Sequence, residues 1–156
     1  MSGRLSAAER RVWQNFVVLS EVVRREVGRD LWADAQLSDA DFTVLAQLAA
    51  APDGTMRSTG CARALGWDTG RFSHQLRRME ERGLVRRGRG EAGDGRAAVV
   101  ALTDEGRTAY RKALGPHMRS AKSWFLDGLD PGQLDHLDTL LQTLLDHVHQ
   151  KAERNA

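Results

Sequence analysis

Apolar residues recur at every third or fourth position over two long stretches, one near each end of the chain. The first stretch covers residues 6–34 and contains Val12, Phe16, Leu19, Val23, Val27 and Leu31. The second contains Leu134, Leu137, Leu141, Leu144 and Val148, with the alternating spacing of three and four that is typical of a coiled-coil seam. Both patterns predict long amphipathic helices. Because Asp130-Pro131 is an N-cap followed by a first-turn proline, the last helix is expected to run from there to about Gln150.

Two shorter helices are expected after the first long one. The segment Ser38–Asp41 is a capping sequence, and the helix that follows it carries Phe42, Leu45 and Leu48. Pro52–Gly54 has the composition of a turn. A short helix near residues 57–65 follows this turn and stops at Gly66.

A third helix is predicted over residues 69–82. Asp68 or Thr69 can cap its N-terminus, and Gly83 is suited to end it in a left-handed conformation. The helical spacing assigns its buried face to Phe72, Leu76 and Met79. The opposite face is therefore expected to be exposed.

Two short strands, 84–88 and 97–102, are predicted around a glycine-rich hairpin. Thr103 caps a further helix, and Gly115-Pro116 is expected to kink or interrupt that helix before it resumes through Trp124 and Phe125. The fold class is thus mainly α with a small β wing. It is a winged helix-turn-helix with N- and C-terminal dimerisation helices.

The chain, residues 1–156, is expected to form a single domain. Residues 37–103 would form the winged helix-turn-helix lobe, and residues 6–35 and 104–150 the dimerisation helices. The small lobe does not cover the apolar stripes of the terminal helices completely. Uncovered stripes of this size favour a homodimer, and a helical cap within one chain is the alternative.

Positive charge is concentrated in the middle of the chain. Residues 57–96 hold 10 Lys and Arg against 5 Asp and Glu, whereas residues 1–56 hold 6 against 8 and residues 97–156 hold 7 against 8. A basic segment of this kind is the electrostatic footprint of a nucleic-acid-binding protein. A solvated helix face and a charged edge hairpin would give the same count.

The exposed face of the helix over residues 69–82 is the candidate DNA-binding surface. Its polar residues are Thr69, Arg71, Ser73, His74, Arg77 and Arg78. A recognition helix presents its N-terminal residues to base edges, so Arg71 is expected to contact guanine, and Ser73 or His74 other base acceptors. Arg77 and Arg78 come later in the helix and are expected to contact phosphates. Each of them taken singly can also be an ordinary solvated residue.

Two motifs resemble those of the MarR family of bacterial transcription regulators. The first resembles the wing of that family and reads Asp94-x-Arg96-x-x-x-Val100-x-Leu102-Thr103-x-x-Gly106. The second resembles its recognition helix and contains Leu65-Gly66-Trp67, Phe72-Ser73, Leu76, Met79-Glu80 and Gly83-Leu84-Val85. The resemblance covers nearly the whole chain. It implies a dimeric repressor that binds a pseudo-palindromic operator in double-stranded DNA, commonly released by small phenolic ligands or by oxidation.

The wing residues of the resemblance have expected roles in DNA binding. Arg96 resembles the family's minor-groove arginine, and Asp94 is placed to fix its guanidinium by a charge-assisted pair. Arg86, Arg87 and Arg89 alternate along the strand and are expected to divide between phosphate contact and solvent. Asp94-Gly95 also has the composition of a simple hairpin turn, and both roles are compatible.

A small aromatic or anionic effector is the expected regulator. The resemblance implies a pocket between the dimer helices and the DNA-binding lobe, which would involve Trp13, Trp32, His117 and Arg119. Tryptophans at such spacings are also typical of a core. The sequence does not name the ligand.

Cys61 raises the alternative of a thiol redox sensor, because a thiol at the start of a helix can be acidified and oxidised. Its place in the short helix favours a buried structural residue instead. No metal or other cofactor is expected, because no cluster has ligand spacing. No catalytic constellation is present, so the protein is not expected to be an enzyme. A second alternative is a winged-helix module that binds proteins without specific DNA binding.

The N-terminal sequence has no apolar core of signal-peptide length, and no run of residues approaches the length of a membrane span. A cytoplasmic location is therefore expected. No membrane partner is expected either.

Overall fold

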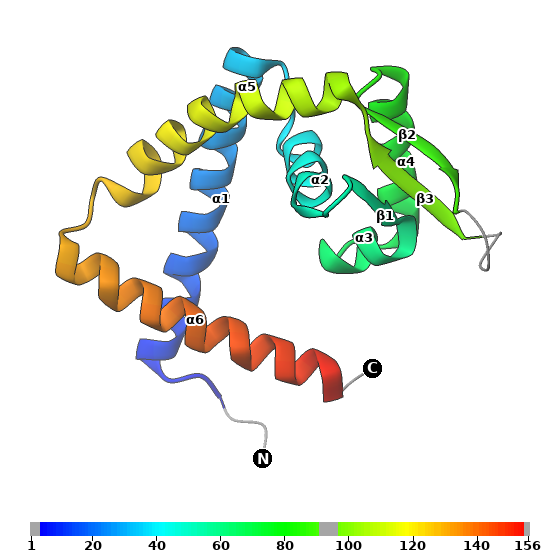
Figure 1. The fold of residues 1–156 in the computed structure, drawn as a ribbon. Coiled ribbons are helices and arrows are strands. Elements are labelled where there is room, and N and C mark those ends of the chain that lie inside the picture. The colour runs from blue at the N-terminus through cyan, green and yellow to red at the C-terminus, as the bar shows by residue number, and fades with distance from the viewer. Residues whose placement is uncertain (1–3, 91–96, 155–156) are drawn as a thin grey trace. The chain divides into compact units, whose positions relative to one another are not determined.

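The computed structural model describes residues 4–90 and 97–154, and the chain forms two compact units that divide after Ser120. The first unit consists of α1 (Ala7–Ala35), α2 (Asp39–Ala50), β1 (Thr55–Arg57), α3 (Ser58–Ala64), α4 (Thr69–Glu81), β2 (Val85–Arg89), β3 (Ala98–Leu102) and nearly all of α5 (Asp104–Ala121) (Figure 1). The second consists of the π-helical turn η1 (Lys122–Leu126) and α6 (Pro131–Arg154). The fold is the expected winged helix-turn-helix, mainly helical with a small antiparallel sheet.

The core of the first unit lies among α2, α3, α4 and the sheet. Its most deeply buried side chains are Leu31, Leu37, Val44, Leu45, Leu48, Cys61, Met79, Val85 and Val100. The apolar residues of α2 and α4 recur at helical spacing, so each helix turns one face inward. This burial is the main stabilising term for helices as short as these.

Local capping chemistry sets the ends of these helices, as the sequence predicts. The Ser38 side chain accepts from the backbone N–H of Asp41, and Asp41 accepts from the N–H of Ser38 in return. Asp68 accepts from the N–H of Arg71 at the start of α4. Gly83 has a φ of 70° immediately after the last turn of α4, a conformation that favours glycine.

The wing is a three-stranded antiparallel sheet with the strand order β1-β3-β2. β2 and β3 pair from Val85 opposite Leu102 to Arg89 opposite Ala98, which confirms the two expected strands. β1 is an addition that the sequence did not predict. It has three residues, too few to show an alternating pattern, and it forms because β3 offers a free edge to Thr55–Arg57.

The sequence predicted a kink or an interruption at Gly115-Pro116. The α5 helix passes through Pro116 without a break and continues to Ala121, so the interruption is wrong, whereas the kink stays a prediction. A proline removes only one hydrogen bond of the helix, and the packing of α5 compensates for this loss. Ala113 is fully buried, and Ser120 donates to Asp30 of α1 at 2.7 Å. The irregular turn comes later instead, at η1.

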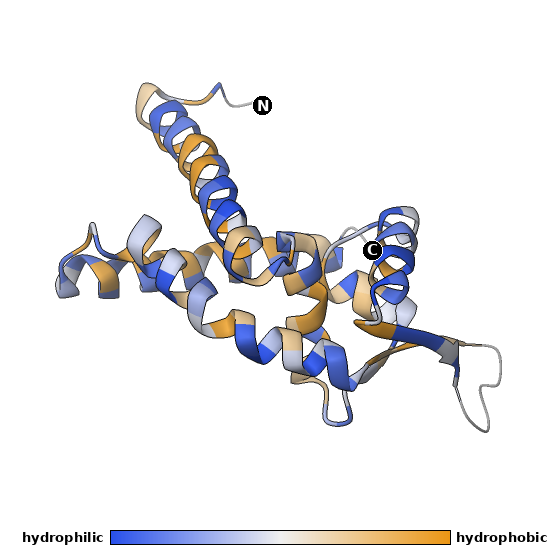
Figure 2. Cartoon of the chain, turned by 90° about the horizontal axis from the view of Figure 1, so that it is seen from above, coloured by the Kyte–Doolittle hydropathy of each residue, from blue (hydrophilic) through white to orange (hydrophobic). Residues whose placement is uncertain are grey.

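Each terminal helix has a long exposed apolar stripe within a single chain. In α1, Val27 and Leu31 are buried, whereas the N-terminal half exposes Val12, Trp13, Phe16, Val17 and Leu19 (Figure 2). No residue of α6, all of which is described, is buried. Its exposed apolar residues include Leu134, Leu140, Leu141, Leu144, Leu145 and Val148.

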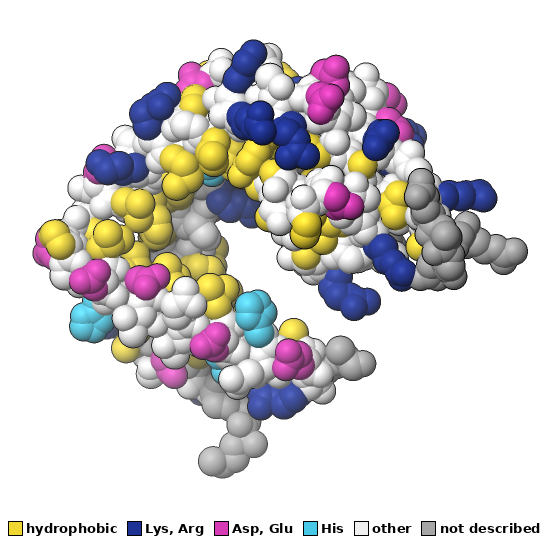
Figure 3. Space-filling model, viewed as in Figure 1, with side chains coloured by type: hydrophobic (Ala, Val, Ile, Leu, Met, Phe, Trp, Pro, Cys, Tyr) yellow, Lys and Arg dark blue, Asp and Glu magenta, His cyan; other side chains and the backbone are white. Residues whose placement is uncertain are grey.

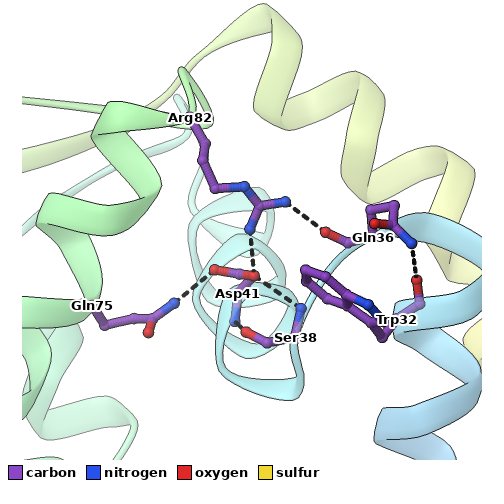
Figure 4. A network of polar contacts seen from close by, with 6 residues as sticks. All are labelled: Trp32, Gln36, Ser38, Asp41, Gln75 and Arg82. Atoms are coloured by element: carbon purple, nitrogen blue, oxygen red, sulfur yellow. Dashed lines mark hydrogen bonds and ion pairs between the residues drawn. The ribbon is translucent and has the colours of Figure 1, made fainter.

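A buried carboxylate joins three helices of the first unit (Figure 4). Asp41, at the start of α2, is 2% exposed and accepts from the Gln75 side chain of α4 at 2.7 Å. It also forms an ion pair of 2.8 Å with Arg82, just after α4. Arg82 in turn donates to the carbonyl oxygen of Gln36 at the end of α1. The middle of α4 and its C-terminal end are thereby tied to the junction of α1 and α2.

Asp41→Ala should lower the free energy of unfolding by about 3 kcal/mol, because it leaves the buried amide of Gln75 without its acceptor and removes the ion-pair partner of Arg82. Asp39→Ala is the matched control, since Asp39 forms an exposed ion pair with Arg24 and its loss should cost less than about 1 kcal/mol. Urea unfolding at one protein concentration measures both values. Equal losses in the two variants would contradict a special role for the buried carboxylate.

Candidate nucleic-acid interface

The α4 helix buries its apolar residues together with Gln75 and exposes its basic residues. Phe72, Leu76 and Met79 are buried, as expected from their spacing. The predicted DNA-binding residues are all exposed on the other face; they are Thr69, Arg71, Ser73, His74, Arg77 and Arg78. The fold therefore presents a polar and basic helix face to solvent while the opposite face holds the helix to the core.

The arginines of α4 differ in how firmly they are held. The guanidinium carbon of Arg71 lies 4.3 Å from the centroid of the Trp67 ring. Arg77 lies 4.0 Å from the carboxylate of Glu81 in an exposed pair, which restrains it little. The sequence assigned no role in DNA binding to Trp67, which lies outside α4, just before the N-cap Asp68, so helical spacing does not indicate its contact with Arg71.

β2 adds a second group of arginines beside α4. Arg87 is anchored, because its guanidinium lies 2.7 Å from Glu80 and its backbone N–H also bonds to that carboxylate. These hydrogen bonds from Arg87 lower the pKa of Glu80 below its usual value. Arg86 and Arg89 are exposed. In Figure 3, basic side chains stand out from the side of the first unit that carries β2 and β3.

The two wing residues with the most specific predicted roles, Asp94 and Arg96, lie outside the described residues. Their expected pairing and minor-groove contact therefore stay predictions. β2 and β3 do fix the base of the hairpin that carries them, since Gly90 donates to the carbonyl oxygen of Ala97 at 3.0 Å.

The four candidate ligand residues do not line one common cavity. His117 lines a groove of about 370 Å³ with Asp39, Phe42, Thr43, Ala46, Gln47 and Leu65. Its ring centroid lies 4.1 Å from that of Phe42, and burial lowers its pKa although Asp39 opposes the shift. Trp13 packs on Phe16 along α1, and Trp32 and Arg119 are exposed. None of these three borders the His117 groove.

Comparisons with known proteins agree with this geometry. Residues 35–97, which span the helix-turn-helix and most of the wing, match the model of the MarR family. AbsC, a MarR family transcriptional regulator from Streptomyces coelicolor, is 28% identical; the alignment covers 96% of this chain and 99% of AbsC, with a TM-score of 0.85. The chain is thus similar to MarR family regulators, in sequence over residues 35–97 and in fold over nearly its whole length.

Two other known proteins are similar to this chain. Sco3205, a MarR family transcriptional regulator from Streptomyces coelicolor solved in complex with DNA, is 26% identical over 93% of this chain and 94% of its own, with a TM-score of 0.84. The organic hydroperoxide resistance transcriptional regulator of Bacillus subtilis (strain 168) is 36% identical over 87 residues. That alignment covers 54% of this chain and 54% of that protein, so the chain spans about half the length of this curated relative.

The thiol of Cys61 is shielded from solvent. Cys61 is fully buried in the core, as its place in the short helix indicated. Burial raises its pKa from 9.0 to about 11. A thiol in this state is a poor nucleophile, because the thiolate is the reactive form.

Neither a metal-binding cluster nor a membrane-spanning helix occurs in the part of the chain that the structure describes. Over residues 4–90 and 97–154, no group of three or more His, Cys, Asp and Glu side chains is placed to hold a metal ion. Within the same ranges, no helix combines the length and the apolar character that crossing a bilayer requires.

Iodoacetamide should alkylate Cys61 of the native protein roughly a hundredfold more slowly at pH 8 than in the urea-unfolded chain, because two pKa units reduce the thiolate fraction by that factor. Intact-protein mass spectrometry over time measures both rates. A native rate equal to the unfolded one would show an accessible, acidic thiol and would favour the redox alternative.

Proposed function

We propose that this chain is a homodimeric, sequence-specific DNA-binding transcriptional regulator of the MarR family that acts as a repressor. The observation that carries the proposal is the exposed basic face of α4, which stands opposite a fully buried apolar face and beside the arginines of β2. The presence of DNA in the structure of Sco3205, which is 26% identical over most of both chains, supports the same assignment.

In the proposed complex, α4 enters the major groove. Arg71, near its N-terminus, contacts a guanine edge through two hydrogen bonds, and Ser73 or His74 contacts neighbouring bases. Arg77 and Arg78 come later in α4 and bind phosphates. Arg86 and Arg89 extend the phosphate contacts along β2, and Arg96 enters the minor groove with Asp94 as its partner.

A protein-interaction module with the same fold is the alternative. Selection of duplexes from a random-sequence pool, followed by gel shifts at several salt concentrations, separates the two functions. The proposal expects one enriched sequence whose affinity falls steeply as salt rises, because arginines displace counterions from the phosphates. The upstream region of the gene itself is the first natural target to try. The absence of any enriched sequence would favour the interaction module.

Arg71→Ala should reduce the preference for the selected duplex by about 1–3 kcal/mol, because a guanine contact is lost, and leave binding to random duplex nearly unchanged. Arg78→Ala is the matched control on the same exposed face. It should weaken both complexes to a similar degree and make the salt dependence shallower.

Arg96→Ala should weaken the selected complex through its minor-groove contact. Fluorescence anisotropy with both duplexes measures these effects, and unchanged affinity and preference in all three variants would contradict the docking.

The proposal of a homodimer rests on the two exposed apolar stripes. The N-terminal half of α1 exposes Val12, Trp13, Phe16, Val17 and Leu19, and α6 exposes its leucine-rich seam. A continuous apolar stripe of this length is costly in water and is typical of an interface. A second copy of the chain supplies matching stripes, and a two-fold axis would place two α4 helices about one DNA turn, roughly 34 Å, apart.

Replacing Leu141 and Leu144 together with Asp should convert the dimer to monomer or aggregate, because charge in a dry seam costs several kcal/mol. Thr139→Asp with Gln142→Asp is the matched control, since these residues lie on the polar face of the same helix. Light scattering gives the mass of each species. A dimeric, DNA-binding Leu141→Asp, Leu144→Asp double variant would show that the interface lies elsewhere.

The proposed regulator is a small aromatic or anionic molecule that relieves DNA binding. The groove at His117 supports this choice, because it combines the rings of Phe42 and His117 with the polar side chains of Thr43 and Gln47. The Nδ1 atom of His117 is buried and has no hydrogen-bond partner within the described residues, so a ligand can satisfy it. Such a ligand changes DNA affinity only by its preference for one spacing of the two α4 helices, typically about 1–3 kcal/mol.

A thermal-shift screen of benzoate and phenol derivatives should identify compounds that raise the Tm of the wild type and of Cys61→Ser equally, and that of His117→Ala less. The same compounds should weaken the complex with the selected duplex. Peroxide is tested as a separate condition and should change neither variant. Release of DNA by peroxide from the wild type but not from Cys61→Ser would make the protein a thiol sensor instead.

A further inference from the structure

Arg71 differs from the other arginines of α4 in having an aromatic platform. Its guanidinium carbon lies 4.3 Å from the centroid of Trp67, within the range of a cation–π contact. The nearest capping carboxylate, that of Asp68, accepts from the backbone N–H of Arg71 at 2.8 Å. The charge of Asp68 is thus used to start the helix, and the ring of Trp67 faces the guanidinium.

Contacts with the core of the first unit hold Trp67, the aromatic platform of Arg71, in place. The backbone N–H of Trp67 donates to the carbonyl oxygen of Ala62 at 2.9 Å, which fixes the turn between α3 and α4. The indole ring is half-buried, packs against the core cluster and meets the ring of Phe72 edge-on at 6.4 Å. Trp67 therefore links the buried face of α4 to a side chain on its exposed face.

Stacking restricts an arginine without using its donors. In a stacked arginine, the face of the guanidinium lies on the ring, and its N–H groups point outward in the plane of the group. A free arginine side chain loses much rotamer freedom when it binds a base, and a stacked one has already lost part of it. The paired alternative, an ion pair with a carboxylate, would occupy the same donors that recognise guanine.

We propose that Trp67 is a positioning residue for DNA recognition: it holds the guanidinium of Arg71 in the orientation that contacts a guanine edge. This inference rests on the proposed function, and it adds a residue that determines sequence preference without touching DNA. Its removal lowers affinity for the preferred sequence and leaves general DNA affinity unchanged.

The first arm of the test uses the free protein. The Nε–H signal of Arg71, assigned by its loss in Arg71→Ala, carries a ring-current shift from Trp67 in the wild type. Trp67→Phe keeps a smaller shift, and Trp67→Leu removes it. An Arg71 signal that is the same in the wild type and in Trp67→Leu overturns the stacking. Trp67→Met fills more of the same volume and replaces Trp67→Leu if thermal melts show that the latter is unfolded.

The second arm is a double-mutant cycle on the duplex that the wild type selects from a random pool. Trp67→Leu lowers affinity for that duplex roughly threefold to tenfold, Trp67→Phe lowers it less, and neither changes affinity for random duplex. In the Arg71→Ala background, Trp67→Leu has no further effect, because the positioned group is absent.

The outcomes separate the two proposals. A wild type that enriches no duplex overturns the proposed function and this inference with it. A wild type that selects a duplex, with Trp67→Leu binding it equally well, overturns the inference alone. The same loss for Trp67→Leu in the wild-type and Arg71→Ala backgrounds assigns Trp67 a purely structural role and also overturns the inference.

Discussion

The orientation of α4 depends on one buried carboxylate. Asp41 accepts hydrogen bonds from its own helix cap and from Gln75, and it pairs with Arg82 at 2.8 Å, while Arg82 reaches the carbonyl oxygen of Gln36. A buried carboxylate needs all these donors, because an unpaired charge in the interior is very costly. The same bonds leave α4 few orientations relative to the end of α1.

Because the orientation of α4 is fixed, its basic residues form a rigid exposed surface. Phe72, Leu76 and Met79 hold α4 to the core, so its arginines stand outward on a rigid support. Trp67 extends that support to the guanidinium of Arg71, and Glu80 holds Arg87 at the start of the wing. A rigid basic surface of this kind loses little entropy on binding a polyanion, which favours recognition of one DNA geometry.

Local patterns predicted most of the fold, and long-range contacts account for what they missed. The spacing of Phe72, Leu76 and Met79 gave α4 its buried face, and Ser38 with Asp41 gave a capping box. The bond from Gln75 to Asp41 spans 34 residues of sequence, and no local pattern indicates it. β1 was missed because three residues show no periodicity, and the helix passes through Pro116 because packing outweighs one lost hydrogen bond.

Protection of guanine N7 from dimethyl sulfate tests the central claim, that α4 contacts base edges in the major groove, most directly. The duplex is the one that the wild-type protein selects from a random pool. The account predicts protected guanines in two half-sites about one helical turn apart, and loss of this protection in Arg71→Ala. A methylation pattern identical to that of free DNA, while gel shifts show the duplex to be bound, would contradict it.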